Sequence, residues 1–211
     1  MSVSVMERPI QFTRLDMEAL LSGQKTVARR AVHLSTVLRF DEPRSQADVD
    51  AGYPFVDTVG GYVPAVQLCP YGQPGERVWV REAFGSQVRR DAAGGTGRFT
   101  VYRASKPDAV DYVTATGKQH PVKWKPCTHM PRHLSRFVLE ITAVRLERLQ
   151  SITPEQALAE GVKGCEQSLD PDGNDYSPYE LFSALWVSIN GMKSWVANPW
   201  VWVIEFKRVQ P

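Results

Sequence analysis

Three cations within six residues make the stretch from Gly23 to Arg30 the strongest candidate for chemistry. A short amphipathic helix precedes it, with Asp16 as the expected N-cap and Gly23 as the left-handed residue that ends it. Lys25, Arg29 and Arg30 follow, so the helix end delivers positive charge to one place. Such a cluster suits an anionic or hydrogen-bond-rich ligand. A solvated basic strand end is the alternative interpretation.

An acid at the end of an apolar row is the second candidate. Residues 77–84 alternate as a strand, with Val78, Val80 and Glu82 on one face. A carboxylate in that row breaks the pattern, and such breaks often mark functional sites. A lysine beside a carboxylate can hold a water or a carbonyl oxygen while the acid moves a proton. Lys25 and Glu82 are therefore the expected catalytic pair, and a structural salt bridge is the alternative.

Further polar, basic and aromatic side chains are candidates for holding a ligand, because cations contact phosphates and aromatic rings stack on bases. The expected binding residues are Thr26, Arg29, Arg30, Trp79, Arg81, His129, Arg132 and Arg136. On an ideal strand Lys25 and Arg30 point to opposite faces, so a bulge or bend is needed to bring both to one cleft. A solvated basic loop is the alternative for the segment around His129.

Cys127, His129 and His133 have the residue types of a zinc site. Pro131 lies between the histidines and the sequence offers no evident fourth ligand, so we expect no metal. We expect no cofactor either.

The composition limits the class of protein. The 211 residues are 43% hydrophobic, which fits one domain with insertions or a domain plus a small subdomain. No apolar run approaches the roughly 20 residues that a membrane span needs, so no membrane partner is expected. The N-terminus lacks the layout of a signal peptide, and the three cysteines are odd in number. These features predict a reduced, cytoplasmic protein.

The net charge of +2 hides an uneven distribution. Residues 77–106 carry seven Lys and Arg against two acids, whereas residues 155–180 carry seven acids against one Lys. Such segregation predicts a basic surface and an acidic flank, and so a polyanionic partner.

The pattern of elements predicts an α+β fold: a small, mostly antiparallel β-barrel decorated with about three helices. The clearest elements are a hairpin over 54–68 with a Gly60-Gly61 turn, a long strand over 136–148, helices opened by Thr153 and Ser177, and a final strand over 200–206. We expect a single domain over 1–211, with loop insertions at 31–53, 85–97 and 164–177.

The motif Gly23-x-Lys25-x-x-x-x-Arg30 after a first helix resembles the signature of the ASCH domain, a PUA-like β-barrel. The turn 74–76 leading into strand 78–82 resembles the second hallmark of that family. Segments around Trp124, at 151–162 and at 186–200 are similar to a phage and prophage branch of ASCH-like proteins, so that the resemblance covers nearly the whole chain.

The resemblance implies two activities. PUA-like barrels commonly bind RNA or modified bases, and some small ASCH proteins are amidohydrolases that remove the acetyl group of N4-acetylcytidine with a Lys, a Thr and a Glu. By position the Lys corresponds to Lys25 and the Glu to Glu82. The Thr position is Ala28, which has no hydroxyl, and Thr26 would point to the opposite face of the strand.

The sequence therefore favours a module that binds nucleic acid, RNA or DNA, or a modified nucleobase in a basic cleft of Lys25, Arg29, Arg30 and Glu82. An amidohydrolase that deacylates N4-acetylcytidine-type nucleosides is the alternative. A phage-encoded interaction or morphogenesis protein without pocket chemistry is the third possibility.

Overall fold

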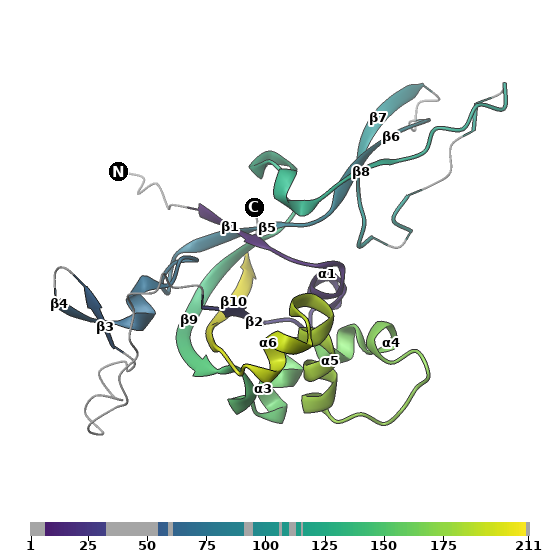
Figure 1. The fold of residues 1–211 in the computed structure, drawn as a ribbon. Coiled ribbons are helices and arrows are strands. Elements are labelled where there is room, and N and C mark those ends of the chain that lie inside the picture. The colour runs from purple at the N-terminus through teal and green to yellow at the C-terminus, as the bar shows by residue number, and fades with distance from the viewer. Residues whose placement is uncertain are drawn as a thin grey trace.

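A curled five-stranded sheet forms the centre of the molecule (Figure 1). The computed structural model describes residues 7–32, 55–58, 61–90, 95–105, 107–109, 113–114 and 116–209. The strand order is β1 (Glu7–Gln11), β5 (Arg77–Arg81), β9 (Val138–Arg148), β10 (Trp200–Val209) and β2 (Val27–Ala31). Neighbouring strands are antiparallel except for the parallel pair β1 and β5.

The sheet is curled but not closed. Its edge strands, β1 and β2, do not pair with each other in the described part of the chain. The chain turns into a helix at Thr13, directly after β1, and a side chain takes the place of strand pairing: the Arg30 guanidinium donates to the Gln11 carbonyl at 2.8 Å. The α+β class is thus confirmed, whereas the closed barrel that we expected is not formed.

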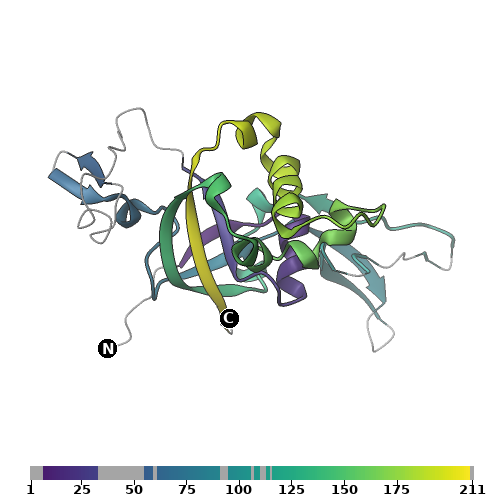
Figure 2. The ribbon, with the colours of Figure 1, turned by 90° about the horizontal axis from the view of Figure 1, so that it is seen from below.

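The last strand explains why the core has two parts. Along β10, Trp202 and Ile204 belong to the cluster inside the curl, while Val201 and Val203 belong to the cluster beneath the helices. Because side chains alternate along a strand, one apolar strand between β9 and β2 serves both layers. Figure 2 shows the helices gathered on the outer side of this sheet.

The residues that the structure describes form five α-helices, rather than about three. They are α1 (Arg14–Leu21), α3 (Pro154–Ala159), α4 (Glu166–Leu169), α5 (Pro178–Asn190) and α6 (Met192–Val196). The predicted caps Thr153 and Ser177 are confirmed, each with a capping box and a proline in the first turn. The N-cap assigned to Asp16 is wrong: Thr13 caps α1, and Asp16 is the third helical residue, closing its capping box. Gly23 has the expected left-handed conformation, with φ of 76°.

Two groups of strands extend from the body (Figure 1). The predicted hairpin is confirmed as β3 (Phe55–Thr58) and β4 (Gly61–Pro64). Gly61 pairs with Thr58 and so belongs to the strand rather than to the turn, and Gly60 lies outside the described residues.

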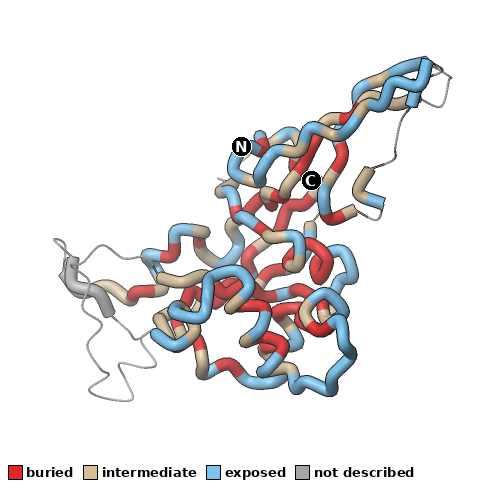
Figure 3. The backbone as a smooth tube through the Cα atoms, turned by 45° about the vertical axis from the view of Figure 1, so that its right-hand side comes forward, coloured by how far each residue is buried: buried red, intermediate tan, exposed pale blue. Residues whose placement is uncertain are grey.

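We call the second group the arm: β6 (Phe84–Arg90), β7 (Thr96–Tyr102) and β8 (Lys123–Lys125), in the order β7-β6-β8. The loop predicted at 85–97 is therefore wrong over most of its length. The arm protrudes from the body (Figure 3). On β6 its less exposed face carries Gly85, Gln87 and Arg89, so that strand lacks the apolar row by which a strand is recognised.

The other two predicted insertions, at 31–53 and 164–177, have different outcomes. Residues 33–53 of the segment 31–53 lie outside the described residues. The segment 164–177 holds the short helix α4 and then runs without regular structure to α5. The longest helix of the described region, α5, has 13 residues, and no helix there could span a bilayer.

Candidate functional site

The ammonium of Lys25 lies in a fully buried position just before β2. It donates to the carboxylate Oε2 of Glu160 at 2.8 Å and to the carbonyl of the same residue at 3.0 Å. The Asp16 Oδ1 atom lies 3.1 Å away on the other side. An ammonium has three donors, so these three acceptors use all of them.

A glycine allows this contact. Gly161 follows Glu160 with φ of 85°, and a Cβ there would lie 2.5 Å from the Ala19 Cβ and 3.1 Å from the Lys25 Cβ. The end of α3 can therefore approach α1 and the start of β2 closely. The Thr26 amide also donates to the Ala159 carbonyl at 2.8 Å, which holds the two segments together.

Arg29 extends the network. Its side chain is 1% exposed, and Nη1 contacts the Glu160 Oε1 atom at 3.2 Å. Its Nη2 atom contacts Glu147 at 3.2 Å and Gln156 at 2.9 Å. Glu160 thus receives a lysine on one oxygen and an arginine on the other, which keeps both cations in place.

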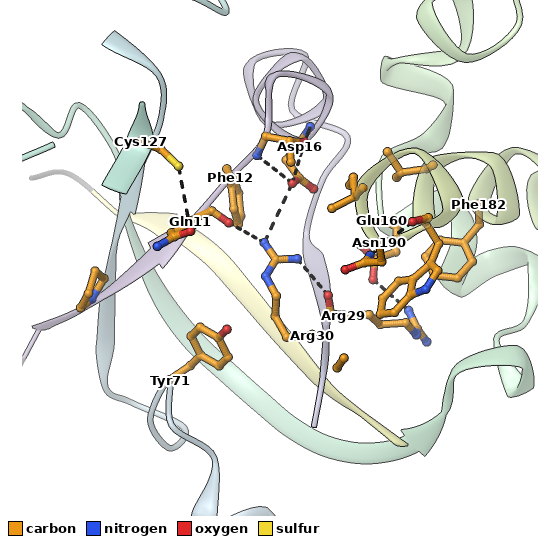
Figure 4. Close-up of a pocket in the computed structure, with 16 residues that line it drawn as sticks. Gln11, Phe12, Asp16, Arg29, Arg30, Tyr71, Cys127, Glu160, Phe182 and Asn190 are labelled. Carbon is orange, nitrogen blue, oxygen red and sulfur yellow. Dashed lines mark hydrogen bonds and ion pairs between the residues drawn. The ribbon is translucent and has the colours of Figure 1, made fainter. Parts of the chain in front are cut away.

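Arg30 occupies the gap between the two edge strands (Figure 4). Its guanidinium donates to the carbonyls of Gln11 and Arg29 at 2.8 and 2.9 Å, and lies 4.0 Å from the Asp16 Oδ2 atom. It also lies over the Phe12 ring, 5.5 Å from the centroid. The side chain keeps 22% of its exposure, so it can still meet a ligand.

Asp16, Arg29, Arg30 and Glu160 line a cleft of about 420 Å³ between β1, β2, α1 and α5, whereas the buried Lys25 is not part of its lining. Its lining consists of Pro9, Gln11, Phe12, Thr13, Asp16, Arg29, Arg30, Ala31, Tyr71, Cys127, Glu160, Phe182, Leu185, Trp186, Ile189 and Asn190. In Figure 4, Asp16 and Arg30 lie on one side of strand β2, and Arg29, Glu160 and Phe182 lie on the other side of it. A concave site of this size, with aromatic rings around a few polar groups, suits a small molecule or one unit of a polymer.

The electrostatics of the cleft are balanced. Burial by itself would raise the pKa of Asp16, but the cations of Lys25 and Arg30 and a backbone hydrogen bond outweigh it and lower that pKa to about 2. Burial would likewise lower the pKa of Lys25, but the carboxylates of Glu160 and Asp16 raise it. Every cation at the cleft faces a carboxylate, so the cleft is polar and charge-balanced rather than basic as we expected.

The expected pair of Lys25 and Glu82 is not formed. Glu82 is 2% exposed and accepts a bidentate contact from Arg136, at 2.7 and 2.8 Å. Burial raises the pKa of Glu82, and the guanidinium of Arg136 only partly offsets that effect. Glu82 and Arg136 do not line the cleft, and Lys25 does not line it either. Strand β5 ends at Arg81, so Glu82 lies between β5 and β6 rather than in the predicted strand, and its partner is the arginine at the base of the arm.

The other predicted binding residues are also outside the cleft, except for Arg29 and Arg30. Thr26 is exposed just before β2 and does not line the cleft. Trp79 is only 7% exposed and packs with Phe84 and Met130, so it cannot stack on a base. Arg81 covers the Trp79 ring at 4.7 Å.

The basic segment after β8 is divided in a similar way. Arg132 forms an ion pair with Glu7 at 2.6 Å, and His129 is exposed. Of this segment only Cys127 reaches the cleft, where its Sγ atom lies 4.0 Å from the Gln11 Oε1 atom. Among the residues that the structure describes, no three His, Cys, Asp or Glu side chains come together as a metal site would require.

Sequence reasoning missed Asp16 and Glu160 as site residues, together with the aromatic lining. One signal was available for Glu160. An acid in the last turn of a helix opposes the helix dipole, so an acid directly before the left-handed Gly161 is a local conflict of the same kind as Glu82. Asp16 gave no such signal, because an acid in a first helical turn is explained by capping alone.

Comparison with known proteins adds no relative: no protein-family model, no curated protein and no solved structure matches the chain. The site must therefore be interpreted from its own geometry.

Proposed function

We propose that the cleft binds a single nucleobase, either in a modified nucleoside or in a nucleic acid. The observation that carries the proposal is the placement of a partly exposed guanidinium, Arg30, and a buried carboxylate, Glu160, in one aromatic-lined cleft. The edge of a base offers ring and exocyclic N–H donors beside carbonyl acceptors. A carboxylate and a guanidinium complement those two kinds of group.

Glu160 has acceptor capacity left for a ligand. A carboxylate has about four lone-pair sites, and the side chain of Glu160 accepts from Lys25 on one oxygen and from Arg29 on the other. The two cations also fix its orientation, so a ligand donor would meet a preorganised acceptor. Phe12, Phe182 and Trp186 are themselves 2 to 4% exposed, so they give the cleft an apolar wall rather than a free stacking platform.

The balance of charge favours a base over a phosphate in the cleft. A phosphate would meet the carboxylates of Asp16 and Glu160, and the pKa of Asp16 of about 2 keeps it ionised at neutral pH. A neutral heterocycle avoids that repulsion. The resemblance of the stretch Gly23–Arg30 to the ASCH signature, and with it to PUA-like barrels, supports the same class of ligand.

A calorimetric titration tests this proposal, with the four ribonucleosides and N4-acetylcytidine as probes. We expect one nucleoside to bind with a 1:1 stoichiometry. Arg30→Gln should weaken that binding at least tenfold, while Lys193→Gln, an exposed change on α6, should leave it unchanged. Absence of binding by every nucleoside, or equal binding by both variants, would overturn the proposal.

Hydrolysis is the second candidate function, and the 2.8 Å contact between Lys25 and Glu160 favours it. The acid that the resemblance places at Glu82 would then be Glu160. Water would add to the acetyl carbonyl as Glu160 takes one of its protons. The C–N bond would then break as Glu160 returns that proton to the cytidine amine, and acetic acid would leave. Ala28 supplies no hydroxyl and all three Lys25 donors are engaged, so binding ranks first.

Incubation with N4-acetylcytidine separates the two functions. Release of cytidine that is abolished in Glu160→Gln and retained in Glu82→Gln would support hydrolysis. Binding without release would leave the chain as a binding protein.

A further inference from the structure

The arm concentrates the positive charge of the chain. Residues 84–125, from the start of β6 to the end of β8, carry eight Lys and Arg against three acids, a net charge of +5. The remaining residues carry 17 Lys and Arg against 20 acids. The modest net charge of the whole chain therefore hides a strongly basic projection on an acidic body.

Strand register places part of this charge on one face of the arm. Ser86 lies opposite Thr100 on one side and Lys123 on the other, so these three side chains share a face. Arg98 and Lys125 belong to the same face, because each is two residues from a member of that row. Arg98, Lys123 and Lys125 are exposed, and among the described residues no carboxylate forms an ion pair with any of them.

The arm is fixed to the body by buried polar and apolar contacts. Arg136 joins Glu82 through two hydrogen bonds and donates to Ser105 at 3.1 Å. Its guanidinium also lies over the Tyr102 ring of β7, 4.3 Å from the centroid. The arm is buried where it meets the body and exposed toward its tip (Figure 3). The charged face is thus held in a defined position instead of on a free loop.

The arm also leads to the cleft. Strand β8 ends at Lys125, two residues before Cys127, which lines the cleft beside Gln11. A chain molecule lying along β8 would therefore pass from the cations of the arm to the opening between the edge strands.

We propose that the arm binds the sugar-phosphate backbone of a single-stranded nucleic acid, one base of which enters the cleft. This inference deepens the proposed function and rests on it for the base in the cleft. Lys and Arg hold phosphates without reading sequence, and the exposed hydroxyl of Thr100 adds a further donor. A base must be unstacked before it can fill a closed pocket, which favours a single strand over a duplex. Among the described residues of this face, no large apolar side chain is exposed, whereas a membrane-binding surface inserts such side chains into the bilayer.

Fluorescence anisotropy tests the proposal with a labelled 20-nucleotide single strand of mixed sequence, as RNA and as DNA, at 50 and 200 mM salt. The variant Arg98→Gln/Lys123→Gln/Lys125→Gln removes the charge of the face. We expect it to bind at least tenfold more weakly, and the slope of log K against log salt to fall by about 2, since each phosphate contact on a single strand contributes roughly 0.7. The matched control is Lys163→Gln/Lys193→Gln/Lys207→Gln, which removes three exposed charges from the body and should change neither quantity.

Two further measurements separate failure of the arm from failure of the cleft. The arm variant should keep wild-type affinity for the nucleoside that the cleft binds. Equal oligonucleotide binding by the arm variant and the control would overturn the arm proposal. Binding to anionic phosphatidylserine vesicles that depends on the arm, without arm-dependent binding to the oligonucleotide, would also overturn it. Arm-dependent oligonucleotide binding with no nucleoside binding at all would support the arm and overturn the cleft.

Discussion

Lys25 and Glu160 meet at 2.8 Å although 135 positions separate them along the chain. The contact joins the end of α3 to the start of β2 and orients Glu160, which lines the cleft. Asp16 and Arg29 complete it, so that two cations and two carboxylates are buried together. A buried network of this kind is stable only while all its members are present.

Removal of the Lys25 charge should destabilise the fold. Lys25→Met leaves Asp16 and Glu160 facing each other in a buried site, which costs about 3–5 kcal/mol of the free energy of unfolding. The control is Lys163→Met, since Lys163 pairs with Glu166 at 2.7 Å but keeps 43% of its side-chain exposure. Such surface pairs are worth about 0–1 kcal/mol. Urea denaturation measures both changes, and equal losses would show that the Lys25 network is not structural.

Asp16 should make stability depend on acid pH. Its pKa lies at about 2 in the folded protein, below the value of 3.8 for a free side chain. A lowered acid pKa gives stability that is fully present above pH 4 and is lost as the pH falls through 2. The difference corresponds to about 2 kcal/mol. Denaturation followed from pH 5 to pH 2 should show this loss in the wild type and a flatter profile in Asp16→Asn; identical profiles would contradict the assignment.

Gly161 should not tolerate a side chain. Gly161→Ala combines a left-handed backbone with a Cβ 2.5 Å from that of Ala19. Backbone strain of about 1–2 kcal/mol and overpacking of about 1–3 kcal/mol should add together. Gly173→Ala is the matched control, because Gly173 has φ of 72° and no atom within 4 Å of the position that a Cβ would take, so only the backbone strain applies. Thermal unfolding compares the two, and an equal loss would mean that the close approach at Gly161 is not tight.

Arg136 should control the arm and not the cleft. Arg136→Gln leaves the Glu82 carboxylate buried without its cation, so we expect faster hydrogen exchange for the amides of β6 and β8. Exchange in α3 and β2 should stay at the wild-type rate. Glu82→Gln, which removes the same charge pair from the other side, should have the same distribution of effects. Faster exchange at the cleft in either variant would instead connect Glu82 to the Lys25 network.

Local patterns predicted the elements better than the site. The sequences Thr153-Pro154 and Ser177-Pro178 identify helix starts because capping uses neighbouring residues only. Alternation identified β9, since one of its faces is buried. Strand β6 of the arm gave no such pattern, because Gly85, Gln87 and Arg89 stand where an apolar row would be expected.

The site depends on contacts between distant segments, and there the sequence was less informative. The cations of Lys25, Arg29 and Arg30 share the carboxylates of Asp16 and Glu160, but only Arg29 and Arg30 line the cleft. The sequence did not indicate these carboxylate partners, because pairing across 135 positions leaves no periodic signal. Glu82 was singled out as a break in an expected strand, but β5 ends at Arg81, and the buried acid anchors the arm instead of lining the cleft.

The most direct test compares the affinity for N4-acetylcytidine of Glu160→Gln and Glu82→Gln with that of the wild type, in one calorimetric series on variants whose folded state is verified by circular dichroism. We predict that Glu160→Gln weakens binding at least tenfold, while Glu82→Gln stays within twofold of the wild type. Loss of binding in Glu82→Gln with full affinity in Glu160→Gln would contradict the assignment of the cleft.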